Sequence, residues 1–502
     1  MKPNYDAGLM DRQMRSGRSR VGLAAGMALA FIGATGLIFP PAAECRPLNI
    51  ILIMADDLGP EMLGCYGAED VQTPHIDRLA REGTFFKTCW ATPVCGPSRA
   101  LIMTGRYGFR TGEWNMGDRP GGPKWARPEL NFCKDQPTFG KMLRRAGYAT
   151  ALAGKWQLSA PSFENITGAG FDEYCIWSIP FHEGYGSRGV RNKEGAKSSG
   201  GSRYWHPSIE QNGKMIRTTE ADYGPDLYCD FLINFMRKNK EKPFLLYYPM
   251  CLPHEPIGAT PVWDGEINSD VHTIRRNVEY IDVLVGRLAA AVEEEGLDGR
   301  TVFIFCGDNG TETNGKNTPT DMACRVPMIL RGPGIKAQGQ VEALMDLSDI
   351  MPTLAAFAET SLPSGFSYDG HDMTPVLSGE SDGMREWIFS YMGPFRMVRS
   401  RDWILECESV DHPGVLHYSE GPGRYEDRSL HPESDSVRRR LIEIMDDKPA
   451  PVINRVERAL FTEYMFGYHH GDNIEALPVS SRNCLEELRK TLSTDHWKPP
   501  RN

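Results

Sequence analysis

Short apolar runs rich in β-branched residues alternate along the chain with segments of helical periodicity. The apolar runs predict buried strands at Leu48–Met54, Tyr148–Ala153, Phe244–Met250 and Thr301–Cys306. The amphipathic segments predict helices at Ile76–Glu82, Asp226–Asn239 and 273–296. Because strands that alternate with helices are typical of α/β proteins, we expect a large α/β sandwich domain around a mostly parallel central sheet.

Polar side chains repeatedly follow these strands at the point where each strand ends. In open α/β sheets the carboxyl edge of the strands is where ligands bind. The pattern therefore predicts convergence of side chains that are far apart in the sequence, namely Asp56, Asp57, Lys155, His254, Asp308 and Asn309.

Two parts of the chain depart from this rhythm. The segment 178–224 is rich in Gly and Ser with interspersed Arg and Lys, and Asn212-Gly213 within it predicts a tight hairpin. We interpret the segment as a solvated surface insertion; the alternative is a loop over the active site that contacts an anionic substrate.

After about Gly379, short strands and one helix predict a small C-terminal α+β subdomain with an antiparallel sheet. These elements are expected at Trp387–Met392, Phe395–Arg399, Trp403–Cys407 and Ser436–Met445.

The bulk composition limits the class of protein. The chain has 502 residues, of which 40% are hydrophobic and 24% charged, which is ordinary for a globular protein. A net charge of −10 argues against a general nucleic-acid binder, so no nucleic-acid partner is expected. The twelve cysteines show no zinc-finger spacing, and their disulfide pairing cannot be read from the sequence.

The N-terminus has the pattern of a targeting segment. A stretch with four arginines precedes the almost wholly apolar run Val21–Phe39, and small residues follow at Ala42 and Ala43. This pattern predicts a signal peptide within residues 1–45 and hence a periplasmic or secreted protein with no membrane contact after cleavage. The alternative is an uncleaved membrane anchor, because about 20 apolar residues can span a bilayer. We expect the catalytic domain at 46–380 and the subdomain at 381–502.

The segment Cys95–Arg106 carries the strongest chemical signal. Its letters, CGPSRALIMTGR, resemble the C-x-P-S-R-x-x-x-(L/M)-T-G-R signature of the type I sulfatases of the alkaline phosphatase superfamily. The resemblance is strong over Leu48 to Gly379 and covers the remainder by general layout. It implies that a formylglycine-generating enzyme oxidises Cys95 to Cα-formylglycine, whose hydrate attacks the sulfur of a sulfate ester. The second hydroxyl of a geminal diol lets the sulfated intermediate collapse and expel sulfate, which splits one hard step into two easier ones.

The same resemblance implies a metal site. Asp56-Asp57 matches the family's paired metal-binding aspartates, and Asp308-Asn309 matches its D-N-G element. Three carboxylates and one amide are hard oxygen ligands that suit Ca²⁺, with Mg²⁺ as second choice. The oxygen of the modified Cys95 would complete the ligand set.

Four further residues match motif positions with roles in the family. Arg99 of the C-x-P-S-R motif would steady the formylglycine, and Lys155 of Gly154-Lys155-Trp156 would contact the nucleophile and a sulfate oxygen. His254 and Lys316 would stabilise the sulfate charge and help protonate the leaving oxygen.

The chain also departs from the family pattern. Gln157 stands where the family has a histidine that hydrogen-bonds the formylglycine hydrate and accepts a proton when sulfate leaves. Glutamine can hold a hydrogen bond but cannot act as a base at neutral pH. His182 or His206 is a weak candidate to replace the histidine. The family's E-G-G turn is also changed, to Asp321–Cys324, which we expect to alter substrate shape more than chemistry.

These observations predict an exported sulfatase whose substrate is a sulfated small molecule or, more specifically, a sulfated carbohydrate. One alternative is a phosphodiesterase or phosphonate monoester hydrolase of the same superfamily. The other is a degenerate anion-binding protein without turnover, which Gln157 alone supports. The sugar, the sulfated position and the choice between endo and exo action have no recognisable code in the sequence.

Overall fold

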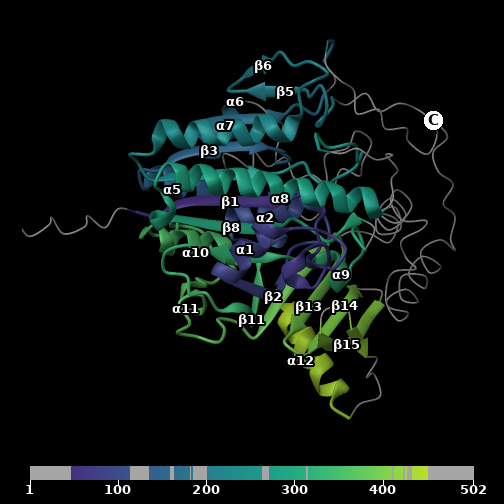
Figure 1. Ribbon diagram of the computed structural model, residues 1–502. Coiled ribbons are helices and arrows are strands. Elements are labelled where there is room, and N and C mark those ends of the chain that lie inside the picture. The colour runs from purple at the N-terminus through teal and green to yellow at the C-terminus, as the bar shows by residue number, and fades with distance from the viewer. Residues whose placement is uncertain are drawn as a thin grey trace, which may run out of the picture. The chain divides into compact units, whose positions relative to one another are not determined.

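The computed structural model (Figure 1) describes residues 47–113, 135–158, 163–180, 182–184, 201–262, 271–312, 315–409, 412–421, 424–426 and 432–449. The predicted signal peptide and the end of the predicted C-terminal subdomain lie outside these residues. Within the described ranges, no helix has both the length and the apolar character needed to cross a membrane.

The main sheet has eleven strands with a parallel centre. Its order is β11-β2-β10-β8-β1-β7-β3-β4-β5-β6, with β9 paired to β2. Strands β8, β1, β7, β3 and β4 are parallel to one another, whereas β10 is antiparallel to β8, β5 to β4 and β6 to β5. The strands are β1 Asn49–Ala55, β2 Thr84–Trp90, β3 Ala149–Gly154, β4 Glu173–Trp177, β5 Ile209–Gln211, β6 Lys214–Ile216, β7 Phe244–Pro249, β8 Thr301–Gly307, β9 Arg325–Val326, β10 Met328–Arg331 and β11 Gly339–Asp346. The predicted mostly parallel sheet is confirmed, and the four predicted strands agree to within one residue at each end.

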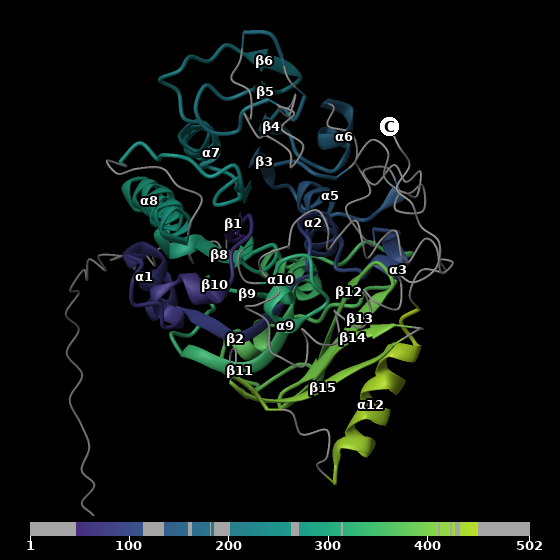
Figure 2. The ribbon, with the colours of Figure 1, turned by 90° about the vertical axis from the view of Figure 1, so that its right-hand side faces the viewer.

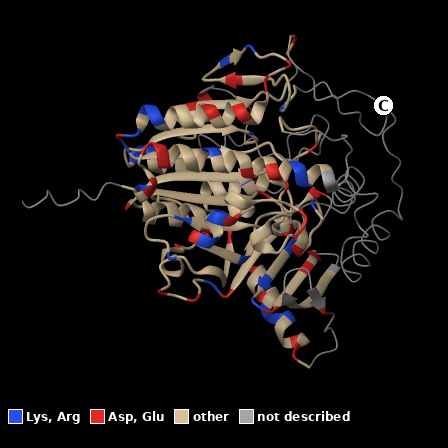
Figure 3. Ribbon diagram, in the orientation of Figure 1, with Lys and Arg blue, Asp and Glu red and all other residues tan. Residues whose placement is uncertain are grey.

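The four central strands are apolar on both faces because helices cover both. Side chains of β1 alternate between two cores: Ile50, Leu52 and Met54 belong to one, and Ile51, Ile53 and Ala55 to the other. Figure 2 shows α1, α7 and α8 on one side of this sheet and α2, α5 and α10 on the other. Figure 3 shows the consequence for charge, since β1, β3, β7 and β8 contain no Lys, Arg, Asp or Glu.

The predicted helices are confirmed, but each of the three begins two residues earlier than expected. They are α1 Pro74–Glu82, α7 Gly224–Asn239 and α8 Val271–Glu294. In α1 and α7 a proline occupies the first turn, where its missing N–H has no intrahelical partner in any case. The other α-helices among the described residues are α2 Cys95–Thr104, α3 Gly108–Thr111, α5 Phe139–Arg145, α6 Phe163–Gly168, α9 Asp321–Cys324, α10 Ile350–Phe357, α11 Thr374–Leu377 and α12 Ser434–Asp446.

The interpretation of the 178–224 segment as a solvated insertion is wrong for residues 201–209, which are mostly buried, whereas positions 213, 214, 217 and 219–221 are exposed. Ser202, Arg203, Tyr204 and Ser208 are buried. Backbone hydrogen bonds tie this stretch to the end of β4, because Gly201 donates to Ile179 and Ser178 donates to Ser208. The hairpin prediction is confirmed, since Asn212 and Gly213 join β5 to β6 with φ of 49° and 81°.

A second, antiparallel sheet lies in the C-terminal part of the chain. Its order is β12-β13-β14-β15-β16, and the strands are Trp387–Met392, Phe395–Ser400, Trp403–Ser409, His412–Gly421 and Arg424–Glu426. The predicted small α+β unit is therefore present, with α12 contacting β13 and β14. Six buried side chains from both parts of the chain form a common cluster: Trp90, Cys324, Leu344, Ile388, Met397 and Ile404. The exact domain boundary at 380 stays a prediction.

Arg385 links the segment before β12 to the main sheet. Its guanidinium is 3% exposed and forms ion pairs with Asp346, the last residue of β11, and with Asp349, both of which are fully buried. Asp346 also caps the short helix Leu347–Asp349 and accepts a hydrogen bond from Tyr107 Oη at 2.6 Å. Breaking a buried pair is costly because the remaining charges lose their partner.

We expect Arg385→Met to lower the free energy of unfolding by about 3–5 kcal/mol, because it leaves two buried carboxylates uncompensated. Denaturant unfolding followed by fluorescence measures this change. Arg440→Met is the matched control, since its ion pair with Glu386 is exposed at both ends (68% and 78%). That control should cost less than about 1 kcal/mol. Equal losses of unfolding free energy for the two substitutions would show that the buried ion pairs of Arg385 stabilise the fold no more than the exposed ion pair of Arg440.

Candidate active site

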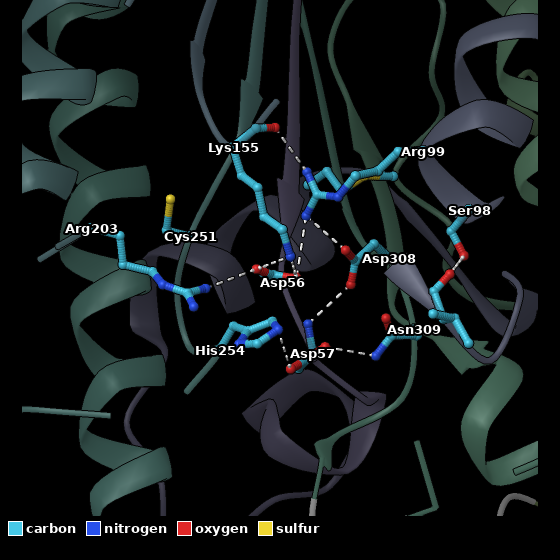
Figure 4. Close-up of polar contacts among 12 residues, drawn as sticks. Asp56, Asp57, Ser98, Arg99, Lys155, Arg203, Cys251, His254, Asp308 and Asn309 are labelled. Atoms are coloured by element: carbon cyan, nitrogen blue, oxygen red, sulfur yellow. Dashed lines mark hydrogen bonds and ion pairs between the residues drawn. The ribbon is translucent and has the colours of Figure 1, made fainter. Parts of the chain in front are cut away.

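The sheet order brings the predicted polar residues to one edge. Strands β8, β1, β7 and β3 are successive neighbours. Their carboxyl ends lead into Asp308-Asn309, Asp56-Asp57, the turn that carries His254, and Lys155 respectively. Figure 4 shows these side chains turned toward one another, so the predicted convergence is observed.

Asp56 is the centre of this arrangement. Its fully buried carboxylate accepts hydrogen bonds from Lys155 Nζ at 2.8 and 2.7 Å, and Arg99 Nη2 lies 3.3 Å from Oδ1. Burial by itself would raise the pKa of Asp56, but Lys155, Arg99, Lys316 and Arg203 outweigh it and hold that pKa below its usual range. The carboxylate is therefore ionised in a site shielded from water.

Asp57, Asp308 and Asn309 are joined by direct hydrogen bonds. The Asp57 backbone N–H donates to Asp308 Oδ1 at 3.0 Å, and Asn309 Nδ2 donates to Asp57 Oδ1 at 2.9 Å. Asp57 has a φ of 68°, which is uncommon for a residue other than glycine and is held here by these bonds. Burial and the adjacent Asp56 carboxylate raise the pKa of Asp308 to about 7, although Arg99 Nη2 donates to Asp308 Oδ2 at 2.7 Å.

Cys95 is the first residue of α2, a helix whose ten residues are all buried. Its Sγ and one carboxylate oxygen each of Asp56 and Asp308 lie within 4.8 Å of one another. Burial raises the pKa of the thiol. Ser98, in the first turn of α2, holds the segment that precedes the helix, because its Oγ accepts a hydrogen bond from the backbone N–H of Thr92 at 2.9 Å.

His254 and Lys316 lie on the Asp57 side of the site. His254 Nε2 is 3.7 Å from Asp57 Oδ2, and Lys316 Nζ forms an ion pair with the same oxygen. His254 Nδ1 lies 2.8 Å from the carbonyl oxygen of Glu255, so Nδ1 carries the proton and Nε2 of the neutral ring is an acceptor. Burial, followed by Lys316, Lys155 and Arg203, lowers the pKa of His254 well below its usual value.

Lys316 keeps its proton. Burial by itself would lower the pKa of this ammonium group, but the carboxylates of Asp57 and Glu312 raise it above its usual value. The site thus holds one protonated cation and one neutral imidazole beside the same carboxylate.

Gln157 lies two residues beyond Lys155 and is half-buried. His182 Nε2 is 2.9 Å from Ser178 Oγ, and His206 lies in the stretch beyond Gly201 with a φ of 46°. The hypothesis that His182 or His206 replaces the family's histidine stays a prediction.

The oxygen donors of this cluster fit a hard divalent cation. Three carboxylates and one amide come from two adjacent strands, and Oδ1 of Asn309 is buried with no hydrogen-bond donor among the described residues. A buried amide oxygen without a donor is unfavourable unless a cation or another donor meets it. The donor set is typical of Ca²⁺ and, next, of Mg²⁺.

Arg203 is a site residue that the sequence did not single out. Its side chain is 3% exposed, and Nη1 lies 3.9 Å from Asp56 Oδ2. The only sequence signal was its membership of the irregular basic segment, where Arg and Lys are usually solvated. The structure brings the other predicted residues together at this edge, and their roles stay predictions: Cys95, Arg99, Lys155, His254, Lys316, Asp56, Asp57, Asp308 and Asn309.

The sequence and the fold both match known proteins. The profile of the family named Sulfatase matches residues 48–360. Steryl-sulfatase of Mus musculus is 29% identical over 434 residues, which cover 71% of this chain and 69% of that protein. Arylsulfatase A of Homo sapiens is 30% identical over 373 residues, which cover 70% and 71%. Two solved structures, Ps i-CgsB and its complex with k-i-k-neocarrahexaose, are each 25% identical, with TM-scores of 0.66 and 0.65. Each covers 80% of this chain and 92% of its own.

We expect Ca²⁺ to stabilise the metal-free protein and Asn309→Ala to weaken that binding at least tenfold. Even residues behind the direct ligands are worth about 10–100-fold in metal affinity. Calorimetric titration with CaCl₂ and the calcium-dependent rise in melting temperature measure the effect. Asn309→Ala removes no charge, so the carboxylates keep their balance.

The matched control for this prediction is Asn49→Ala. Asn49 is also a buried asparagine, and it lies at the opposite end of β1. Its substitution should leave calcium affinity unchanged. A calcium affinity that survives Asn309→Ala, or falls equally with Asn49→Ala, would contradict the assigned ligand set.

Proposed function

The chain belongs to the sulfatase family of the alkaline phosphatase superfamily and hydrolyses sulfate esters, and we propose from this premise that it is an exported, formylglycine-dependent and calcium-dependent sulfatase of sulfated carbohydrates. The observation that carries the proposal is the position of Cys95. It adjoins the carboxylates of Asp56 and Asp308 at the edge where the buried cations gather.

Conversion of Cys95 to Cα-formylglycine is supported by a mismatch of ligand types. Sulfur is a soft ligand, whereas the carboxylates around Cys95 suit a hard cation that prefers oxygen. When formed, the formylglycine supplies an aldehyde hydrate whose hydroxyl is a nucleophile toward sulfate esters. We propose that a formylglycine-generating enzyme of the host carries out this modification.

Asp56, Asp57, Asp308 and Asn309 would hold the Ca²⁺, and the ion would supply Lewis-acid polarisation of a sulfate ester. The described residues also prepare this edge for an anion. Lys155 and Lys316 carry positive charge at two sides of the aspartate pair, and Arg99 keeps Asp308 oriented through its 2.7 Å hydrogen bond. Preorganised charges of this kind stabilise charge that develops during the reaction without reorganisation.

The residues proposed to stabilise the leaving oxygen and to accept a proton lie on the Asp57 side of the site. Lys316 can donate a hydrogen bond to the leaving oxygen and stabilise its charge, and the acceptor nitrogen of neutral His254 can take a proton there. Arg99 cannot take part as an acid, because guanidinium stays protonated in proteins.

The carbohydrate assignment rests on a comparison and on the expected compartment. Ps i-CgsB, which has a TM-score of 0.66 with this chain, forms a complex with k-i-k-neocarrahexaose. An exported enzyme, as the N-terminal pattern predicts, meets extracellular sulfated glycans rather than cytosolic metabolites. The predicted signal peptide thus agrees with the proposed substrate class.

Release of inorganic sulfate from a panel of sulfated mono- and oligosaccharides tests this function. The enzyme is co-expressed with the formylglycine-generating machinery and supplied with Ca²⁺. We expect sulfate from at least one substrate, an aldehyde at position 95 by peptide mass, and complete loss of release with Cys95→Ala. Cys229→Ala, a buried cysteine in α7, is the matched control and should retain activity. Release of phosphate alone from phosphoesters would instead identify the phosphohydrolase alternative.

Gln157→His tests the departure from the family pattern. If proton acceptance at this position limits turnover, histidine should raise kcat at neutral pH by roughly 10²-fold, the usual contribution of a positioned base. An unchanged kcat would mean that another residue already supplies the acceptor. The pH dependence of kcat separates the two results, because a new base adds an ionisation near the usual pKa of histidine.

A further inference from the structure

Arg203 is a buried cation that points into the site from an unexpected part of the chain. Its side chain is 3% exposed, and its Nη1 lies 3.9 Å from Asp56 Oδ2. Figure 4 shows the guanidinium directed at Asp56 from the side opposite Asp308. The distance allows an ion pair but exceeds that of a hydrogen bond.

The guanidinium has unused donors. Its Nε and Nη1 atoms are buried and make no hydrogen bond among the described residues. A charged donor left unpaired away from water is expensive, and native structures rarely keep one without a purpose. Two buried donor nitrogens beside the proposed metal and sulfate site therefore call for an acceptor that arrives with a ligand.

The scaffold holds Arg203 rigidly in this orientation. The guanidinium carbon lies 4.4 Å from the ring centroid of Trp177, which ends β4. The next residue, Tyr204, donates from its hydroxyl to the carbonyl oxygens of Cys251 at 2.7 Å and His254 at 2.5 Å. The backbone of Gly224 packs so closely that an added Cβ would lie 2.2 Å from the Arg203 carbonyl oxygen. The side chain is thus prepared in advance for its acceptor, which reduces the entropic cost of binding.

We propose that Arg203 is a substrate-binding residue that donates hydrogen bonds to an oxygen of the sulfate ester. The inference rests on the proposed binding of the ester at the Asp56 edge. Arg203 and Lys155 approach the same carboxylate oxygen, Asp56 Oδ2, at 3.9 and 2.7 Å. An ester oxygen that contacts Lys155 therefore lies within reach of Arg203. A planar guanidinium presents paired donors that suit such an oxyanion.

Arg203 also bears on the missing histidine at position 157. A guanidinium donates hydrogen bonds but does not accept protons. It can thus replace the anion-binding part of that histidine's role while leaving the proton-accepting part to another residue. This separation of roles is consistent with a chain that has Gln157 and still belongs to a hydrolytic family.

Binding of inorganic sulfate gives the first test. Calorimetry uses the calcium-loaded, full-length Cys95→Ala protein, which cannot turn over substrate. Adding Arg203→Gln should weaken sulfate binding by about 10–100-fold, the usual worth of hydrogen bonds to a charged group. Arg203→Lys should recover part of the affinity. Arg217→Gln, an exposed arginine in the same segment, is the matched control and should change nothing.

Substrate dependence gives the second test, with the formylglycine-containing enzyme. Arg203→Gln should lower kcat/KM about 10²-fold, as for loss of one oxyanion donor. The loss should be similar for 4-nitrophenyl sulfate, which has one charged group, and for a polysulfated oligosaccharide. A loss confined to the polysulfated substrate would overturn the proposal and assign Arg203 to a second anionic group.

The outcomes separate this inference from the proposed function. Equal sulfate affinity of the Arg203→Gln and parent proteins, with normal turnover by the parent, would overturn only the role of Arg203. Absence of both sulfate binding and turnover in the parent would overturn the proposed function itself.

Melting temperatures of Arg203→Gln and Arg203→Lys control for folding. If Arg203→Gln does not fold, the Lys variant still decides, because unchanged sulfate affinity and unchanged kcat/KM with 4-nitrophenyl sulfate would contradict the specific guanidinium contact.

Discussion

Three carboxylates packed together away from water are the constraint on which the site depends. The carboxylates of Asp56, Asp57 and Asp308 repel one another and lose hydration, and both effects raise the pKa of Asp308. Buried cations offset this cost: Lys155 and Arg99 at Asp56, Arg99 again at Asp308, and Lys316 at Asp57. The same cations leave the edge positive enough for an anion once a divalent cation is added, which is the electrostatic requirement for sulfate ester hydrolysis.

Both sheets contribute to the position of the charged residues at this site. The parallel centre of the main sheet brings the carboxyl ends of β8, β1, β7 and β3 together. The second sheet supports the segment that follows Lys316. The backbone of Cys407 in β14 donates to the Pro319 carbonyl at 3.0 Å, and Glu406 accepts from the backbone of Asp321 at 2.8 Å. The C-terminal unit is therefore part of what positions the segment that follows Lys316, and not only a covering of apolar surface.

Substrate recognition combines a fixed reaction centre with less regular surroundings. The proposed metal ligands and Lys155 directly follow strands, whereas Arg203 comes from the 201–208 stretch between β4 and β5. Loops of this kind vary more readily than strands and are where specificity usually develops. A fourth cation at the Asp56 edge would be one way for this chain to bind its ester tightly without the histidine that Gln157 replaces.

The sequence by itself determined the fold class, the central strands and the family, and its motifs predicted which residues meet at the site. Apolar runs bounded by turn residues predict buried strands, because a strand covered on both faces must be apolar at every position. The C-x-P-S-R motif lies at a helix start, and the Asp-Asp and Asp-Asn motifs directly follow strand ends. The starts of α1 and α7 were missed by two residues because a proline in the first turn looks like a break. The tertiary structure alone decided the burial of Arg203 and the support of the Lys316 segment by β14. Both depend on contacts between residues distant in the sequence, Arg203 with Asp56 and Cys407 with Pro319, and no local periodicity or propensity records such a contact.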